Sequence, residues 1–122
     1  MNTPIVRRGD VWLVALDPTV GAEISKTRPS VVISNDVANQ YALTVTILPI
    51  TNKGEKVRPY EAAIPAQVAG LIKDSKAKCQ QVRTVDKQRL IRYLGNLPDQ
   101  YIHDIERAVC LHLGISGLEK DD

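Results

Sequence analysis

Runs of β-branched residues, each ended by a turn signal, fill the first half of the chain. They read GDVWLVAL at 9–16, SVVIS at 30–34 and LTVTILPIT at 43–51, and Asp17-Pro18 and Asn35-Asp36 follow the first two. Val, Ile and Thr fit the pleated surface of a strand, whereas Asp-Pro and Asn-Asp pairs form turns. The chain has no Phe and one Trp, so its core must consist mainly of Val, Ile and Leu. These features predict a β-rich fold.

Shorter strands are predicted in the second half, over residues 60–65, 75–85 and 89–97, and a single helical turn is predicted over 36–42. Within 75–85 the side chains alternate between two expected faces, Ala77, Cys79 and Gln81 against Lys76, Lys78 and Gln80. Pro49 lacks the N–H that a strand ladder needs. We therefore expect it at an edge, at a bulge or near a strand end.

One convincing helix is predicted near the end of the chain. Pro98 and Asp99 suit a helix start, because proline needs no donor there and an acid favours the positive end of the helix dipole. Gly114 is expected to end the helix. The apolar residues at helical spacing are Ile102, Ile105, Val109 and Leu113. Strands joined by short turns and then one helix predict a partly open small β-barrel with a C-terminal helix packed on it.

Length and composition predict a single globular domain over residues 1–114, with residues 115–122 as a flexible tail. Of the 122 residues, 43% are hydrophobic and 25% charged. No apolar run approaches the ~20 residues of a membrane span, and the first ten residues contain no apolar signal segment. We therefore expect a cytoplasmic protein without a membrane partner. A net charge of +2 is weak evidence for any partner.

The cysteines and histidines form no metal or catalytic pattern. Cys79 and Cys110 have neither CxxC spacing nor a nearby histidine pair, so we expect two free, buried thiols. His103 and His112 fall in the predicted helix and are expected at its surface or its ends. The sequence predicts no metal site and no cofactor.

Arg28 stands directly before Pro29, at the start of the SVVIS strand. Proline restricts the preceding residue to extended conformations, so the guanidinium is expected at a fixed place at the mouth of a buried strand. Its planar fork of donors matches phosphate oxygens. A surface ion pair with Glu23 or Asp36 is the alternative role.

Two other polar segments accompany this arginine. Thr51 ends the LTVTILPIT strand, where its hydroxyl is placed to meet a ligand. The segment QQVRTVDKQRL at 80–90 forms a compact polar patch. The alternative for this patch is a solvated face in which Arg83 pairs with Asp86. Taken singly, each segment is explained without a ligand.

Taken together, the three segments resemble the MazF/PemK family of bacterial toxins. The resemblance rests on RRGDVWLVALDPTVGAEISKTRPSVVIS at 7–34, ILPIT at 47–51 and QQVRTVDKQRL at 80–90. It runs from about Arg8 to Leu113. It implies the toxin of a type II toxin–antitoxin system, folded as an SH3-like small β-barrel with a C-terminal helix and working as a homodimer.

The resemblance also implies an activity and partners. The expected enzyme is a sequence-specific, metal-independent endoribonuclease that cuts single-stranded RNA, mRNA above all. Its products carry 2′,3′-cyclic phosphate and 5′-hydroxyl ends, and the cuts arrest translation and growth. The expected protein partner is a cognate antitoxin whose acidic, partly disordered C-terminal segment covers the RNA groove. DNA is expected to be bound only through the toxin–antitoxin complex.

Carried onto this sequence, the resemblance assigns catalysis to Arg28 and Thr51. Arg28 suits stabilisation of charge on the phosphorane, although a guanidinium is a poor proton donor. Thr51 is expected to hold the phosphate in line. Tyr60 is a candidate stacking surface for an unpaired base, and a solvated charged loop is the alternative for residues 53–58. The residues expected to bind substrate are Glu23, Lys26, Thr27, Lys53, Lys56, Arg58, Lys78, Gln81 and Arg83.

Gln80 is the third expected catalytic residue, at a position where many members of the family have an acid. An amide cannot take up a proton near neutral pH as a carboxylate does. Either Gln80 is a natural variant whose base lies elsewhere, on Glu23 or a water, or it is an introduced replacement that makes a toxin tolerable to its host. We expect Gln80→Glu to raise RNA cleavage strongly, and equal rates would remove Gln80 from the mechanism.

Two rival functions stay open at this level. One is a non-cleaving SH3-like module that binds RNA or antitoxin. The other is a structural partner that only binds an antitoxin within an operator complex. Discrete RNA cuts with cyclic phosphate ends distinguish the nuclease from both.

Overall fold

The computed structural model describes residues 4–54 and 56–116. The helices and strands within these residues are β1 (Asp10–Ala15), β2 (Thr27–Val32), α1 (Asp36–Tyr41), β3 (Thr44–Asn52), β4 (Ala62–Ile64), β5 (Ser75–Ala77), β6 (Arg83–Asp86), β7 (Leu90–Asn96) and α2 (Asp99–Leu113). Two short 3-10 turns, η1 (Cys79–Gln81) and η2 (Lys87–Arg89), flank β6. The predicted helical turn is α1. Residues 117–122 of the predicted tail lie outside the described residues.

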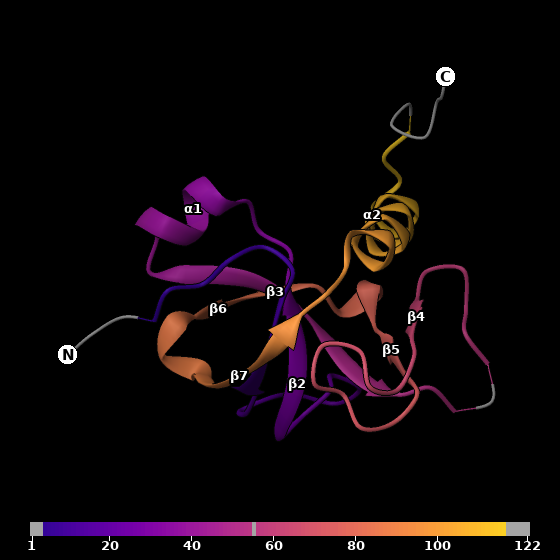
Figure 1. Cartoon of the computed structure of the whole chain (residues 1–122), viewed down its shortest axis with the longest axis horizontal. Helices are drawn as coiled ribbons and strands as arrows, with labels where there is room; N and C mark the ends of the chain where they lie inside the picture. Colours follow the sequence, from indigo (N-terminus) through magenta and orange to yellow (C-terminus); the bar gives the residue numbers. More distant parts are fainter. Residues whose placement is uncertain (1–3, 55, 117–122) are drawn as a thin grey trace.

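The strands form one curled antiparallel sheet, with α1 and α2 at opposite ends of the molecule (Figure 1). The strand order is β4–β5–β3–β2–β1–β7, and β6 pairs with β3. In the described part of the chain no pairing joins β4 to β7, so the sheet is barrel-like but not closed. The β4–β5 loop approaches β7 instead, since a Cβ on Gly95 would lie 2.7 Å from the Ala69 carbonyl carbon. The predicted mainly β fold with a partly open barrel is confirmed.

β3 is the longest strand and has partners on both edges. Residues 47–49 pair with β2 on one edge, while 44–47 pair with β6 and 50–52 with β5 on the other. On this second edge the Pro49 carbonyl accepts a hydrogen bond from Lys78 N at 2.8 Å. A strand residue directs its N–H and C=O to the same edge, so the donor that Pro49 lacks would face the gap between β5 and β6. Pro49 therefore lies at a break in the pairing within β3, where an edge, a bulge or a strand end was expected.

The single strand predicted over 75–85 is wrong, because this gap divides it into β5, η1 and β6. Opposite Pro49 the ladder has no N–H with which to continue. Gln81 N instead donates to Lys78 O at 2.9 Å and closes the η1 turn. Gln80 and Gln81 therefore lie on a tight turn and not on alternating faces of a strand.

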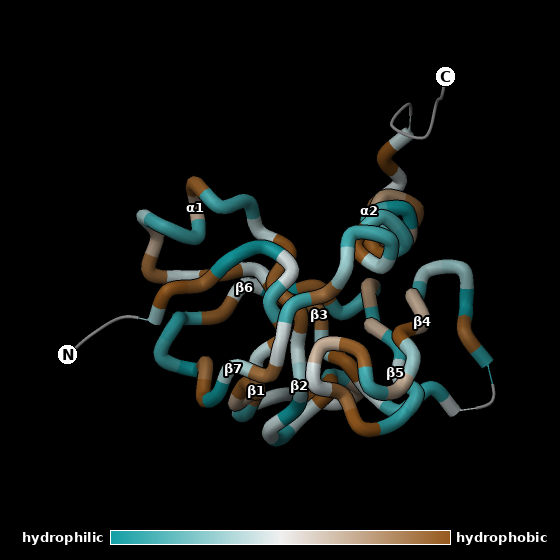
Figure 2. The backbone as a smooth tube through the Cα atoms, in the orientation of Figure 1, coloured by the Kyte–Doolittle hydropathy of each residue, from teal (hydrophilic) through white to brown (hydrophobic). Residues whose placement is uncertain are grey.

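Two hydrophobic clusters lie on opposite faces of the sheet. Val31 and Leu48 belong to the larger cluster, which α2 covers, and Val32 and Ile47 belong to the smaller one. Adjacent residues of a strand point to opposite faces, so both faces of β2 and β3 are buried here. Figure 2 shows hydrophobic strand segments below α2 and hydrophilic positions on the outer side of that helix.

α2 is the predicted C-terminal helix, with Pro98 as its N-cap. Ile102, Ile105 and Ala108 are its buried residues, and Gly114 ends it at φ 71°, a left-handed conformation that favours glycine. Leu113 was expected on the buried face but is 52% exposed, because the last turn of α2 projects beyond the sheet (Figure 1). No helix in the described ranges is long and apolar enough to cross a membrane.

Both cysteines are free, but only Cys79 is buried. The expectation of two buried thiols is wrong for Cys110, which is half-buried near the end of α2. Burial, together with the nearby Glu61 charge, raises the pKa of the Cys79 thiol to about 12. This thiol therefore stays protonated near neutral pH, and a protonated thiol is a poor nucleophile.

Candidate active site

A groove of about 500 Å³ runs between the β1–β2 loop and η1. The loop supplies one wall, β3 contributes Pro49, and the segment from η1 into β6 supplies the other wall. The lining residues are Ala22, Glu23, Ile24, Pro49, Gln80, Gln81, Val82 and Arg83. Four predicted site residues, Glu23, Gln80, Gln81 and Arg83, therefore meet in one place although the loop and η1 are far apart in the sequence.

Gln81 fixes the β1–β2 loop against this groove. Its Oε1 accepts a hydrogen bond from Ile24 N at 2.7 Å, and its Nε2 donates to Ala22 O at 3.3 Å. Gln81 was expected to bind substrate, but both ends of its amide are engaged with the loop backbone. Its position favours a role in holding the loop.

Two arginines of the 80–90 patch hold the start of the same loop. Arg83 donates to Leu16 O at 3.2 Å, and Arg89 donates to Ala15 O at 2.9 Å. The described residues include no ion pair between Arg83 and Asp86, which was the alternative for this patch. The patch therefore positions one wall of the groove.

Arg28 lies near the start of β2 with an exposed side chain. Its Nε donates to Ser25 O at 3.2 Å, which orients the guanidinium. Glu23 and Asp36, the two acids considered as partners, accept hydrogen bonds from backbone N–H groups instead. In the described part of the chain Arg28 forms no ion pair, so its charge is not neutralised by a carboxylate.

Thr51 points to the same side of the sheet as Arg28. Ser30 of β2 pairs with Pro49 of β3, and Arg28 and Thr51 each stand two residues beyond this pair at the same end. Residues two apart on a strand share a face. Pro49 lines the groove on this face, but Arg28 and Thr51 are not among the lining residues. Thr51 Oγ1 donates to Asn52 O at 3.3 Å.

Glu61 is a buried acid that the sequence analysis did not single out. Only 6% of the residue is exposed. Its Oε1 accepts from Arg58 N at 3.0 Å and pairs with Lys76 Nζ at 3.0 Å, while its Oε2 pairs with Lys78 Nζ at 2.7 Å. Burial by itself would raise the pKa of Glu61, but these donors lower it to about 2. The only sequence signal was a lone acid before a short apolar strand.

Gln80 lies between the Glu61 cluster and the groove. Its Nε2 donates to Glu61 Oε2 at 3.5 Å, and its Oε1 is buried and has no hydrogen-bond partner among the described residues. Within residues 4–54 and 56–116, no three His, Cys, Asp or Glu side chains converge as a metal site would require. The side chains that line the groove offer amide, guanidinium and carboxylate groups.

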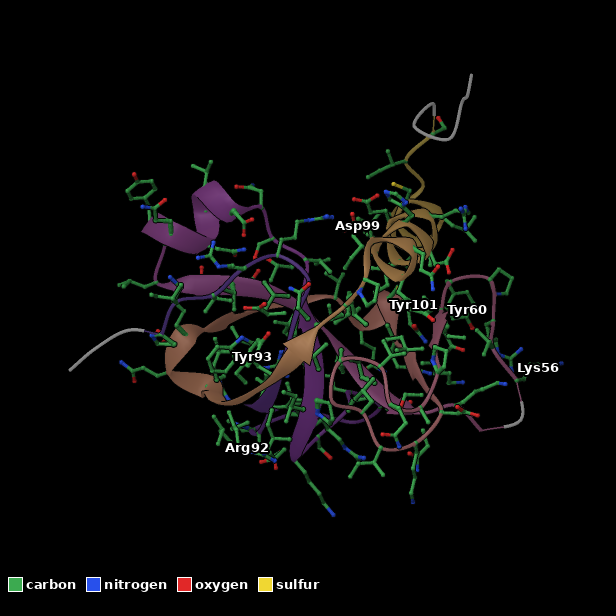
Figure 3. All side chains as sticks on the ribbon, in the orientation of Figure 1. Lys56, Tyr60, Arg92, Tyr93, Asp99 and Tyr101 are labelled. Atoms are coloured by element: carbon green, nitrogen blue, oxygen red, sulfur yellow. The ribbon has the colours of Figure 1, made fainter. Side chains whose placement is uncertain are left out.

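The remaining predicted substrate-binding residues are less closely gathered. Lys26 and Thr27 are exposed where the β1–β2 loop enters β2. Lys53 and Lys56 are exposed on the β3–β4 loop, and Figure 3 shows Lys56 at the outer edge of that loop, pointing away from the sheet. Tyr60 lies half-buried beside β4. None of these five lines the groove.

Residues 7–113 match the family described as the PemK-like, MazF-like toxins of type II toxin–antitoxin systems, and the chain belongs to this family. The predicted MazF/PemK resemblance is confirmed. Among curated proteins, the chain is 36% identical over 116 residues to Endoribonuclease MazF9 of Mycobacterium tuberculosis, which covers 91% of this chain and 98% of that protein.

Solved structures share the fold at lower identity. A crystal structure of MazF from Deinococcus radiodurans has a TM-score of 0.78 at 21% identity, covering 91% of this chain and 98% of that one. An endoribonuclease in complex with its cognate antitoxin, from a mycobacterial species, has a TM-score of 0.76 at 20% identity, covering 92% and 98%. The predicted toxin fold is confirmed.

Proposed function

We propose that this chain is an endoribonuclease toxin that cuts single-stranded RNA at the groove between the β1–β2 loop and η1. The observation that carries the proposal is an exposed arginine, Arg28, on the same face and at the same end as Thr51 and without a carboxylate partner among residues 4–54 and 56–116. A groove lined by Glu23 and Gln80 adjoins them. Family membership and the 36% identity to a protein named an endoribonuclease support it.

The reaction is an internal transesterification. The ribose 2′-oxygen attacks the adjacent phosphorus, the bond from phosphorus to the 5′-oxygen breaks, and the products are a 2′,3′-cyclic phosphate and a 5′-hydroxyl. One proton leaves the 2′-hydroxyl, and one reaches the departing 5′-oxygen. Charge builds on the nonbridging oxygens, so donors aimed at those oxygens lower the barrier.

The roles follow from the chemistry of each side chain. The fork of Arg28 contacts two nonbridging oxygens at once, and the Thr51 hydroxyl holds the phosphate in line with the attacking oxygen. Glu23 is the carboxylate among the groove-lining residues, so it takes the 2′-hydroxyl proton. Solvent supplies the proton to the 5′-oxygen, because a guanidinium is a poor proton donor. No step uses a metal.

The proposal includes the partners of such a toxin. Two copies form a homodimer, and an acidic antitoxin segment neutralises the enzyme by occupying the groove. DNA is contacted only through the toxin–antitoxin complex. Because the substrates are cellular mRNAs, the site of action is the cytoplasm. Residues 1–114 act as the single catalytic domain.

End mapping on a long single-stranded RNA in the presence of EDTA tests the proposal. We expect discrete cuts that leave 5′-hydroxyl and 2′,3′-cyclic phosphate ends. Arg107→Ala is a suitable control, since Arg107 is exposed on α2 and its ion pair among the described residues is with Asp104 at 3.2 Å. Tight RNA binding without cuts would overturn the nuclease and favour a non-cleaving module, for which Gln80 in place of an acid is the supporting observation.

A further inference from the structure

The Glu61 cluster carries an inference that rests on the proposed function and deepens it. We propose that Glu61 is a positioning residue that fixes the side-chain amide of Gln80, so that Gln80 Oε1 accepts a hydrogen bond from the ribose 2′-hydroxyl at the cleavage site. Gln80 then orients the nucleophile without taking up its proton. This gives an amide a function at the position where an acid was expected.

The orientation of the Gln80 amide follows from its neighbour. Glu61 is ionised near neutral pH and offers only acceptors, and its Oε2 lies 3.5 Å from Gln80 Nε2. A flipped amide would place Oε1 against a carboxylate, which is repulsive. The amide nitrogen therefore faces Glu61, and the amide oxygen is turned away from it.

The carboxylate is itself held in place. Lys76, Lys78 and the Arg58 N–H all bind it at 3.0 Å or less. Lys76 lies in β5, Lys78 follows β5, and Arg58 precedes β4. A buried carboxylate with this many partners has little freedom to rotate. Glu61 is therefore a rigid reference point for the amide beside it.

The oxygen of the Gln80 amide is the unsatisfied atom of the cluster. It is buried and has no partner among the described residues, and a buried acceptor in that state carries an uncompensated desolvation cost. Gln80 also lines the groove, so a donor that reaches Oε1 from the groove removes this cost. The 2′-hydroxyl is a donor present on every ribonucleotide and absent from DNA. The cluster therefore favours RNA over DNA.

Binding of uncleaved oligonucleotides tests the Gln80 contact without requiring catalysis. An RNA with a single 2′-deoxy nucleotide at the cleavage site is compared with the same RNA carrying a 2′-amino group there, which still donates a hydrogen bond. We expect the wild-type chain to bind the deoxy form about 5–20-fold more weakly, as loss of one hydrogen bond implies. Gln80→Ala should bind both forms alike. An equal deoxy penalty in both proteins would overturn the inference.

The role of Glu61 is tested by a double-mutant cycle on cleavage with Glu61→Gln, Gln80→Ala and the combined variant. If Glu61 acts through Gln80, each single change lowers kcat/KM, and the combined variant is no worse than Gln80→Ala. Additive losses would overturn the role. Glu106→Gln is the matched control, because Glu106 forms an exposed pair with Arg8 at 2.9 Å.

A readout without RNA separates this inference from the proposed function. The side-chain amide NMR signals of Gln80, identified by their absence in Gln80→Ala, should shift in Glu61→Asp, which keeps the charge but withdraws the carboxylate by one methylene. Unchanged signals in a folded Glu61→Asp would overturn the inference. If Glu61→Gln does not fold, Glu61→Asp also replaces it in the cycle. Failure of the wild-type chain to cut RNA would overturn the proposed function alone.

Discussion

Glu61 shows how a buried acid stays ionised in a small domain. Burial disfavours its charge, but two lysines and a backbone N–H compensate, so the pKa lies near the bottom of the range for carboxyl groups. The low pKa makes Glu61 a poor general base near neutral pH. It therefore suits a supporting role better than proton transfer, which the proposed mechanism assigns to Glu23.

The lowered pKa of Glu61 predicts a loss of stability in acid. The folded value of about 2 lies below the ordinary 4.5, so the ionised form stabilises the fold fully above about pH 5 and this contribution disappears as pH falls toward 2. The shift corresponds to roughly 3 kcal/mol. Urea unfolding at a series of pH values should show a smaller acid loss in Glu61→Gln than in the wild type. Identical acid losses would contradict this account.

Gln80→Glu tests the Glu61 cluster by changing the residue that donates to Glu61. The change places a second carboxyl group beside Glu61, and like charges raise the pKa of one member of such a pair. A carboxyl group with a raised pKa at the groove is a better base, so cleavage should rise, while stability should fall as pH increases through that pKa. The control is Gln88→Glu, at an exposed position of η2. Equal cleavage rates for Gln80→Glu and the wild type would contradict the expectation.

At the scale of elements, the feature that shapes the site is the break in the pairing of β3 with β5 and β6 opposite Pro49. It creates η1, and η1 carries Gln80 and Gln81 to the groove and lets Gln81 reach the β1–β2 loop. The strands around it were predictable, because β-branched runs and turn residues mark them. The break could not be predicted in the same way, because the alternation within 75–85 is a local pattern, whereas the missing N–H is that of Pro49 on β3.

Gln81→Ala should release the β1–β2 loop. The hydrogen bond that Ile24 N donates to Gln81 Oε1 and the one that Gln81 Nε2 donates to Ala22 O disappear, at a cost of about 1–2 kcal/mol. The Ile24 amide should exchange with solvent faster, and cleavage should fall through a higher KM because the loop forms one wall of the groove. Gln88→Ala on η2 is the matched control. Unaltered exchange at Ile24 would show that Gln81 does not hold the loop.

At the scale of the whole molecule, the resemblance predicted the family and the class of fold, and both are confirmed. Arg28, Thr51 and Gln80 could be named from the sequence because short motifs mark them. Glu61 could not, because its importance depends on Lys76, Lys78 and Gln80 converging on it in three dimensions. Lys53 and Lys56 of the β3–β4 loop are the opposite case, because they form a cluster in the sequence but do not line the groove.

The exposed apolar residues predict self-association. Ile5, Tyr41 and Leu43 lie together near α1 and are each more than half exposed, and exposed apolar patches mark interaction surfaces. Sedimentation at micromolar concentration should give a mass of about 27 kDa, twice the 13.5 kDa of the chain. A species of 13.5 kDa would contradict the homodimer.

The rate of RNA cleavage by Arg28→Lys tests the central claim most directly. Lysine keeps the charge but lacks the planar fork that contacts two phosphate oxygens. Under single-turnover conditions we predict a rate about 10²–10³ lower than the wild type, with RNA binding within a fewfold of it and Arg107→Lys unaffected. A cleavage rate for Arg28→Lys equal to that of the wild type would contradict the assignment of Arg28 to the reaction.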